Sequence, residues 1–150
     1  MRHTMRWLAG GAIFLALAAA QFAPARRSDP PESAPLAAPL PVAEILTRSC
    51  GDCHSNDTRW PWYTSVAPVS LLAIRDVEGG RRQINFSEWS AYNAAARRHK
   101  LQWMHRALGS ETMPPWEYQL AHPGSHLSAA DRATLSRWID AELLSAASGK

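Results

Sequence analysis

The five residues Cys50-Gly51-Asp52-Cys53-His54 carry the clearest chemistry in the sequence, and they contain both cysteines of the chain. Cysteines three positions apart in a helical turn lie on one face, so each thiol could add to one vinyl group of a haem. The next residue, His54, is then directed at the iron, and this spacing is typical of c-type haem attachment. We therefore predict a covalent haem c held by Cys50 and Cys53, with His54 as an iron ligand.

Two other interpretations of the paired cysteines have less support. A structural zinc site needs about four ligands, and the chain has no second cysteine pair. A thioredoxin-like thiol–disulfide pair would lie beside a strand–helix unit, which the sequence around Cys50 and Cys53 does not indicate.

The loop around Met113, about sixty residues after the motif, is expected to supply a second iron ligand. Haem iron in electron carriers is usually held on both faces, and methionine or histidine fills the second position. Pro114-Pro115 stiffen this loop and limit the entropy lost when it closes over a haem face. Met104 falls within a helical stretch, where core packing is the expected role. We predict that Met113 binds the iron; the remaining candidates are His99, His105, His122 and His126.

Haem propionates are carboxylates, and they require cationic or polar donors. The candidates are the tryptophan indole N–H groups and four arginines, among which spacing alone does not choose: Arg59, Arg75, Arg81 and Arg82.

Residues 1–23 have the layout of a signal peptide: Arg2 and Arg6 make a positive start, and an apolar run over residues 7–23 ends in small residues. The alternative is an uncleaved anchor, since the run is at the lower edge of the length that spans a bilayer. The arginine pair at 26–27 would then have to cross the membrane, against the usual charge bias. We expect a periplasmic protein, either soluble after cleavage or anchored to the inner membrane by residues 7–23.

Residues 24–41 are expected to form an extended linker, because they hold six of the eleven prolines. The domain that carries the chemistry then occupies residues 42–150. Helical spacing dominates it and sustained two-residue alternation is absent, so we predict an all-α, cytochrome c-like domain with long loops around one haem.

The helices of this domain can be placed from their capping and breaking residues. Residues 111–115 must be loop, because Pro114-Pro115 cannot continue a helix. The first expected helix starts at Pro41 and runs to the motif, with a weak point at Gly51. A second covers residues 69–77 and is ended by Gly79-Gly80, and a third begins at Glu88 with Ser87 as its cap. A fourth covers residues 98–108 and is followed by Gly109, and the last begins at Ser128, with Asp131 completing a capping box.

The formal net charge of +3 does not describe the folded domain. Four of the sixteen basic residues, Arg2, Arg6, Arg26 and Arg27, precede every acidic residue, which leaves twelve basic against thirteen acidic residues. Nucleic-acid binding needs a basic patch on the folded domain, so we expect no nucleic-acid partner.

Several stretches beside the haem motif are more specific than the motif itself, above all Thr58-Arg-Trp-Pro-Trp-Tyr63 and Asn85-Phe-Ser-Glu-Trp89. With Met113-Pro-Pro115 they resemble a bacterial haem-binding domain family of the cytochrome c type, over roughly residues 42–142. The resemblance implies a single c-type haem with His54 proximal, and it is compatible with Met113 as the distal ligand. Further matching residues are Ala67–Ser70, Asp76-Val77, Gly80-Arg81, Tyr118, His122 and Trp138.

Three functions fit these features. The first is one-electron transfer to a redox partner protein, after haem attachment by a c-type maturation machinery. The second is a haem sensor or small peroxidase-like enzyme with an open sixth position, although Glu111 and Glu117 offer no convincing acid–base pair. The third is a domain of a larger complex that passes electrons through the basic helix at residues 97–100.

Overall fold

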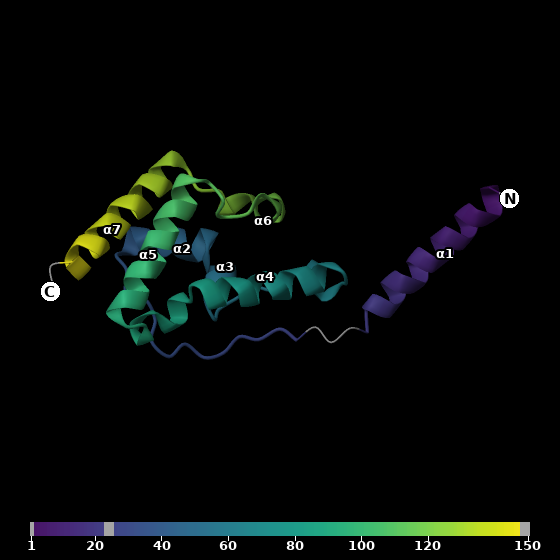
Figure 1. The fold of residues 1–150 in the computed structure, drawn as a ribbon, viewed down its shortest axis with the longest axis horizontal. Coiled ribbons are helices and arrows are strands. Elements are labelled where there is room, and N and C mark those ends of the chain that lie inside the picture. Colours follow the sequence, from purple (N-terminus) through teal and green to yellow (C-terminus); the bar gives the residue numbers. More distant parts are fainter. Residues whose placement is uncertain (1, 23–25, 148–150) are drawn as a thin grey trace.

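The computed structural model describes residues 2–22 and 26–147, and every regular element in these residues is helical. The prediction of an all-α chain is therefore confirmed for the described residues (Figure 1). The elements are α1 (Arg2–Ala20), α2 (Leu40–Ser49), α3 (Gly51–His54), α4 (Val69–Gln83), α5 (Ala94–Gly109), α6 (Trp116–Ala121) and α7 (Ala129–Ala147), with 3-10 turns η1 (Trp62–Ser65), η2 (Phe86–Ala91) and η3 (Pro123–Ser125).

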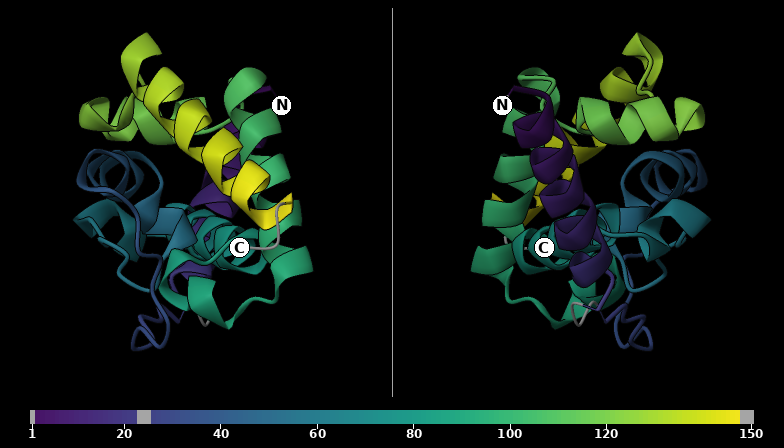
Figure 2. Two further views of the ribbon diagram at one scale, coloured as in Figure 1. Left: turned by 90° about the vertical axis from the view of Figure 1, so that its left-hand side faces the viewer. Right: turned by 90° about the vertical axis from the view of Figure 1, so that its right-hand side faces the viewer.

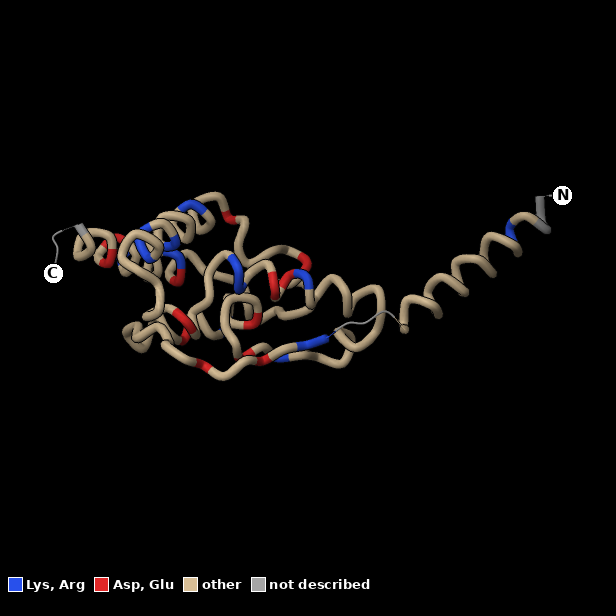
Figure 3. The backbone as a smooth tube through the Cα atoms, turned by 60° about the horizontal axis from the view of Figure 1, so that its bottom comes forward, with Lys and Arg blue, Asp and Glu red and all other residues tan. Residues whose placement is uncertain are grey.

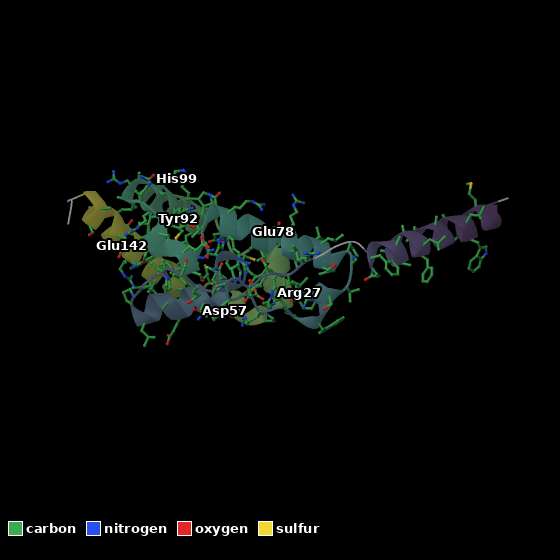
Figure 4. All side chains as sticks on the ribbon, turned by 90° about the horizontal axis from the view of Figure 1, so that it is seen from below. Arg27, Asp57, Glu78, Tyr92, His99 and Glu142 are labelled. Atoms are coloured by element: carbon green, nitrogen blue, oxygen red, sulfur yellow. The ribbon has the colours of Figure 1, made fainter. Side chains whose placement is uncertain are left out.

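Helix α1 projects from one end of the molecule (Figure 1), and its side chains stand off the helix with no other element beside them (Figure 4). Just past its end, the Gln21 amide pairs with the backbone N–H and C=O of Ala67. No helix within residues 2–22 and 26–147 is long and apolar enough to cross a membrane. The expected small-residue cleavage region ends at Ala23, which lies outside the described residues.

The haem motif spans a break between two helices. Helix α2 begins at Leu40 with Pro41 in its first turn, as expected for proline, and it ends at Ser49. Cys50 leaves the helical region at φ −128°, and the short helix α3 then carries the rest of the motif. The predicted weakening at Gly51 is confirmed by this break.

Helix α4 is longer than the sequence indicates, because the prediction that Gly79-Gly80 would end it is wrong. The helix continues through both glycines to Gln83. A Cβ on Gly80 would lie 2.3 Å from the carbonyl oxygen of Cys53, whereas one on Gly79 would meet nothing nearer than 3.9 Å. Gly80 therefore serves close packing of α4 on the haem motif and does not stop the helix.

The segment after α4 also differs from the prediction. The Ser87 side chain does not cap a helix starting at Glu88; instead Asn85 caps the 3-10 turn η2. The long helix α5 starts only at Ala94, where the Asn93 side chain accepts a hydrogen bond from the Ala96 N–H. α5 contains the expected helical stretch 98–108 and extends it to Ala94 and Gly109. The start at Glu88 expected for the preceding helix is wrong, because residues 86–91 form η2.

Helices α5 and α7 lie side by side and form the larger part of the core with α2 (Figures 1 and 2). Ser128 and Asp131 form the predicted capping box at the start of α7, with hydrogen bonds in both directions. The buried cluster is aliphatic and aromatic, and it comprises Val42, Ile45, Leu46, Ile84, Trp89, Leu101, Met104, Leu108, Leu127, Leu135, Trp138 and Ile139.

The proline-rich segment lies against the body as an extended strap, defined here as residues 28–38, and does not stand free of the domain. The backbone N–H groups of Ala34 and Leu36 donate to the carbonyls of Ser87 and Phe86 at 3.1 and 2.8 Å. Leu36 also packs on the core. Proline blocks helix formation, but an extended chain can still pair with an irregular edge such as η2.

Candidate functional site

A cavity of about 480 Å³ opens between α3, α4, α5 and the loop that precedes α6. Cys50, Cys53, His54 and Met113 all line it, so the structure brings the four predicted site residues together. The rest of the lining is largely apolar, with Phe86 and Trp103 close to the His54 ring at centroid distances of 6.0 and 6.1 Å. Volume and lining are those of a site for a large apolar ligand.

The imidazole of His54 is oriented by the carboxyl-terminal end of α4. Its Nδ1 lies 3.0 Å from the Gly80 carbonyl oxygen and 3.1 Å from that of Ile84. Two acceptors at Nδ1 require the proton on that nitrogen, which leaves the lone pair of Nε2 free. Burial lowers the pKa of His54 and favours the neutral ring. A neutral, oriented imidazole is the form that binds a metal.

Both cysteines are free thiols beside this ring. Burial, with a smaller contribution from the neighbouring Cys53, raises the pKa of Cys50 to about 12; burial also raises that of Cys53 to about 11. The reactive cysteine of a thiol–disulfide catalyst instead has a lowered pKa. The described residues contain no group of three or more His, Cys, Asp or Glu side chains that could hold a metal ion. The geometry therefore gives the zinc and redox-thiol interpretations no support.

Asp52, between the two cysteines, anchors the motif through its carboxylate. It accepts hydrogen bonds from Nε and Nη2 of Arg59 at 2.9 and 3.0 Å and from the Tyr118 hydroxyl at 2.6 Å. Burial alone would raise the pKa of Asp52, but these donors outweigh it and the pKa lies below its ordinary value. Burial and the bond to Asp52 raise the pKa of Tyr118. Asp52 thus stays ionised and Tyr118 stays protonated.

A second polar network supports the residues that follow the motif. Arg81 donates to the Ser55 carbonyl at 2.7 Å and to the Thr58 hydroxyl at 2.8 Å. The Asn85 side-chain amide donates to Asn56 at 2.8 Å. These partners come from the stretches that resemble the haem-binding family, and their role is to fix the motif against α4 and η2.

The structure separates the candidates for the second iron position. Met113 lines the cavity from the loop, and Met104 lines it from α5 as part of the buried core. His122 uses both ring nitrogens, one toward the Tyr118 carbonyl and one toward the Tyr63 hydroxyl, each at 3.0 Å. His126 is bonded to Gln119, and the solvent-exposed His99 and His105 do not line this cavity.

The arginines proposed for the propionates fall into two groups. Arg59 and Arg81 are held by Asp52 and by the Ser55 and Thr58 oxygens described above. Arg75 and Arg82 line the cavity instead, on α4. Arg82 forms a long ion pair of 3.7 Å with Glu78, and both side chains are exposed.

Basic side chains at the start of α5 donate hydrogen bonds to backbone carbonyls of the same domain. Arg97 donates to the carbonyls of Tyr92 and Ser90, and Lys100 donates to that of Gln83. Acidic and basic residues are interspersed over the body of the chain (Figure 3). That a redox partner docks on residues 97–100 stays a prediction.

The chemistry of the lining tests whether the cavity fits a haem. The walls are largely apolar, as the ring of a haem requires. Two free thiols, the unprotonated Nε2 of His54 and the thioether of Met113 are groups that would attach a haem and bind its iron. The lining therefore fits a haem.

A helical domain with these groups around one cavity has the features of a haem-binding protein. The model of the haem-binding domain family matches residues 15–141, and the chain belongs to this family. The match begins within α1 and so includes the strap as well as the domain. Comparison with curated proteins and with solved structures gives no significant match.

Proposed function

We propose that this chain is an exported c-type cytochrome that carries one covalent haem and transfers one electron at a time in the periplasm. The observation that carries the proposal is the single cavity lined by two free thiols, by His54 with a free Nε2, and by Met113. Bound haem iron supplies the chemistry, since it alternates between the ferric and ferrous states.

The residues of the chain then have distinct roles. Cys50 and Cys53 would attach the haem, and His54 and Met113 would bind its iron. Arg75 and Arg82 on α4 neutralise the propionates, because they are the cavity-lining arginines without a carboxylate partner closer than 3.7 Å among the described residues. Electron transfer needs no substrate pocket, and a closed sixth position excludes small ligands.

The test of this function is the optical spectrum of protein produced with a c-type maturation system, oxidised and reduced, with and without carbon monoxide. A low-spin spectrum, the weak near-infrared methionine–iron band and no carbon monoxide binding are expected. A high-spin ferrous form that binds carbon monoxide would overturn the carrier proposal and favour the sensor or peroxidase-like enzyme.

Covalent attachment has its own test in the mass of the denatured protein. The wild type should retain one haem under denaturing conditions, and Cys50→Ala/Cys53→Ala should lose it. Retention of haem by the double variant would contradict attachment through these thiols.

Export is proposed from the layout of residues 1–23. Periplasmic fractionation of the full chain, followed by the intact mass of the product, distinguishes cleavage near residue 23 from retention of the segment. Recovery of haem-free protein in the cytoplasm alone would contradict export.

A further inference from the structure

A single hydrogen bond connects the haem motif with the segment that follows Met113. The Tyr118 hydroxyl donates to Oδ2 of Asp52 at 2.6 Å, across 66 positions of sequence. Asp52 lies between the two cysteines, and Tyr118 lies on α6, five residues after Met113. Both Met113 and Tyr118 line the cavity.

The inner end of this connection is rigid. Asp52 is 6 % exposed, and its carboxylate is already fixed by Arg59. The backbone carbonyl of Asp52 accepts a further hydrogen bond, from the buried Thr58 hydroxyl at 2.8 Å. Tyr118 therefore binds to an acceptor whose position is set by the motif itself.

The outer end is held as well. The Tyr118 ring stacks on the His122 ring at a centroid distance of 4.1 Å and an interplanar angle of 24°. His122 in turn contacts the Tyr63 hydroxyl through Nε2. The chain of contacts Asp52–Tyr118–His122–Tyr63 thus joins α3, α6 and η1.

The other side-chain restraints on this segment are local in sequence. The Gln119 amide donates to the Pro114 carbonyl at 2.6 Å, and its oxygen lies 2.9 Å from Nδ1 of His126. Pro114 is buried, but neither Gln119 contact reaches the haem motif.

No buried apolar residue belongs to α6, and Trp116 and Leu120 on that helix are 71 % and 76 % exposed. Burial of apolar surface therefore does not hold α6 in place. The polar contacts of Tyr118 and His122 take that role.

We infer that Tyr118 is a positioning residue that fixes the Met113 loop over the haem face through its hydrogen bond to Asp52. The inference rests on the proposed function for the iron ligand, whereas the ordering of the loop does not depend on it. A hydrogen bond to a buried charged group contributes roughly 1.5–3 kcal/mol. Its loss should increase the open population of the loop roughly 10- to 100-fold.

The experiment compares Tyr118→Phe with Tyr92→Phe in the haem-loaded protein. Tyr118→Phe keeps the ring stacked on His122 and removes only the hydroxyl. Tyr92→Phe is the matched control, since its hydroxyl accepts a hydrogen bond from the Asn85 N–H outside the loop. The two readouts are hydrogen exchange of residues 113–121 and the methionine–iron band, with carbon monoxide binding as a measure of opening.

Tyr118→Phe should accelerate hydrogen exchange in residues 113–121 and carbon monoxide binding roughly 10-fold or more, because both rates follow the open population of the loop, while Tyr92→Phe changes neither. The methionine–iron band should decrease only by the fraction of molecules that open. Unchanged exchange in Tyr118→Phe would overturn the inference. Faster exchange with unchanged carbon monoxide binding would show a merely structural role and would also overturn it.

The double variant Met113→Ala/Tyr118→Phe separates the inference from the proposed function. If Met113 binds iron, Tyr118→Phe no longer alters the spectrum in this background but still accelerates exchange. A wild type without the methionine–iron band contradicts the ligand assignment and with it the placement of Met113 on the haem face. If Tyr118→Phe still accelerates hydrogen exchange in that case, the role of Tyr118 is limited to ordering the loop.

Discussion

His54 and Met113 differ in how firmly the protein holds them. His54 is buried and fixed by two backbone carbonyls, while Met113 lies half-buried in a loop that a few polar contacts keep in place. Loss of the distal side chain should therefore leave the proximal side of the site intact.

Met113→Ala should convert a low-spin haem into a high-spin one that binds carbon monoxide, with the haem still covalently attached. The reason is that the proposed attachment uses Cys50 and Cys53, which this substitution leaves unchanged. Optical spectra and the mass of the denatured protein measure both effects. An unchanged spectrum would exclude Met113 as ligand and point to Met104, the other methionine that lines the cavity.

Gly80→Ala should lower the free energy of unfolding by roughly 1–3 kcal/mol or more, because the added Cβ would overlap the Cys53 carbonyl. Gly79→Ala is the matched control one residue away, where the nearest atom to the new Cβ is Nη2 of the Arg82 side chain at 3.9 Å. It should be neutral or stabilising by up to about 1 kcal/mol, as for alanine in a helix interior. Thermal unfolding of both variants tests this, and equal effects would contradict the packing role of Gly80.

Individual residues show where the sequence is informative about the site. The motif predicts His54 and both cysteines because its spacing is chemically specific. The roles of Gly80, Asp52 and Tyr118 depend on contacts across 26 to 66 positions, and no local pattern encodes those contacts. The family resemblance includes Gly80 and Tyr118, and it is the only signal that marks them.

The predictions of secondary structure succeed or fail mostly at the ends of helices. Ser128 with Asp131 predicts the start of α7 correctly, because a capping box satisfies backbone groups locally. The glycine pair in α4 misleads for the opposite reason, since tertiary packing of Gly80 overrides its helix propensity. No element is predicted from the sequence over residues 116–121, where α6 forms, because six residues after two prolines give too short a pattern to identify.

Asp131→Ala should destabilise the protein by about 1 kcal/mol at neutral pH, since it removes the capping box and the contact with Arg48 at 2.9 Å. Hydrogen bonds from Ser128 hold the pKa of Asp131 below its ordinary value. The contribution is therefore present above the ordinary carboxyl pKa and lost as pH falls through the folded value. Thermal unfolding at about pH 7 and about pH 3 measures it; a difference between wild type and variant that persists in acid would contradict the assignment.

At the scale of the whole molecule, the strap over residues 28–38 contributes contacts that stabilise the domain. Glu32 accepts a hydrogen bond from the buried Ser87 hydroxyl at 2.7 Å, in addition to the backbone pairs with η2. Sequence composition predicts an extended segment, as observed, but it does not reveal that η2 offers an edge for it.

A chain that begins at residue 39 should unfold at a temperature at least about 5 °C lower than one that begins at residue 26, because the strap contacts contribute a few kcal/mol in sum. Both truncations lack α1, so the comparison isolates the strap. Equal midpoints in thermal unfolding would show that residues 28–38 act only as a linker.

If His54 binds haem iron as proposed, the hydrogen bonds at its Nδ1 would also affect the redox potential of that haem. An imidazole that donates its Nδ1 proton to the carbonyls of Gly80 and Ile84 is a more basic ligand through Nε2. Greater electron donation stabilises ferric over ferrous iron and lowers the potential, against the raising effect of a methionine on the other face. The carboxyl end of α4 and the loop of Met113 would thus set the potential of this protein from opposite directions.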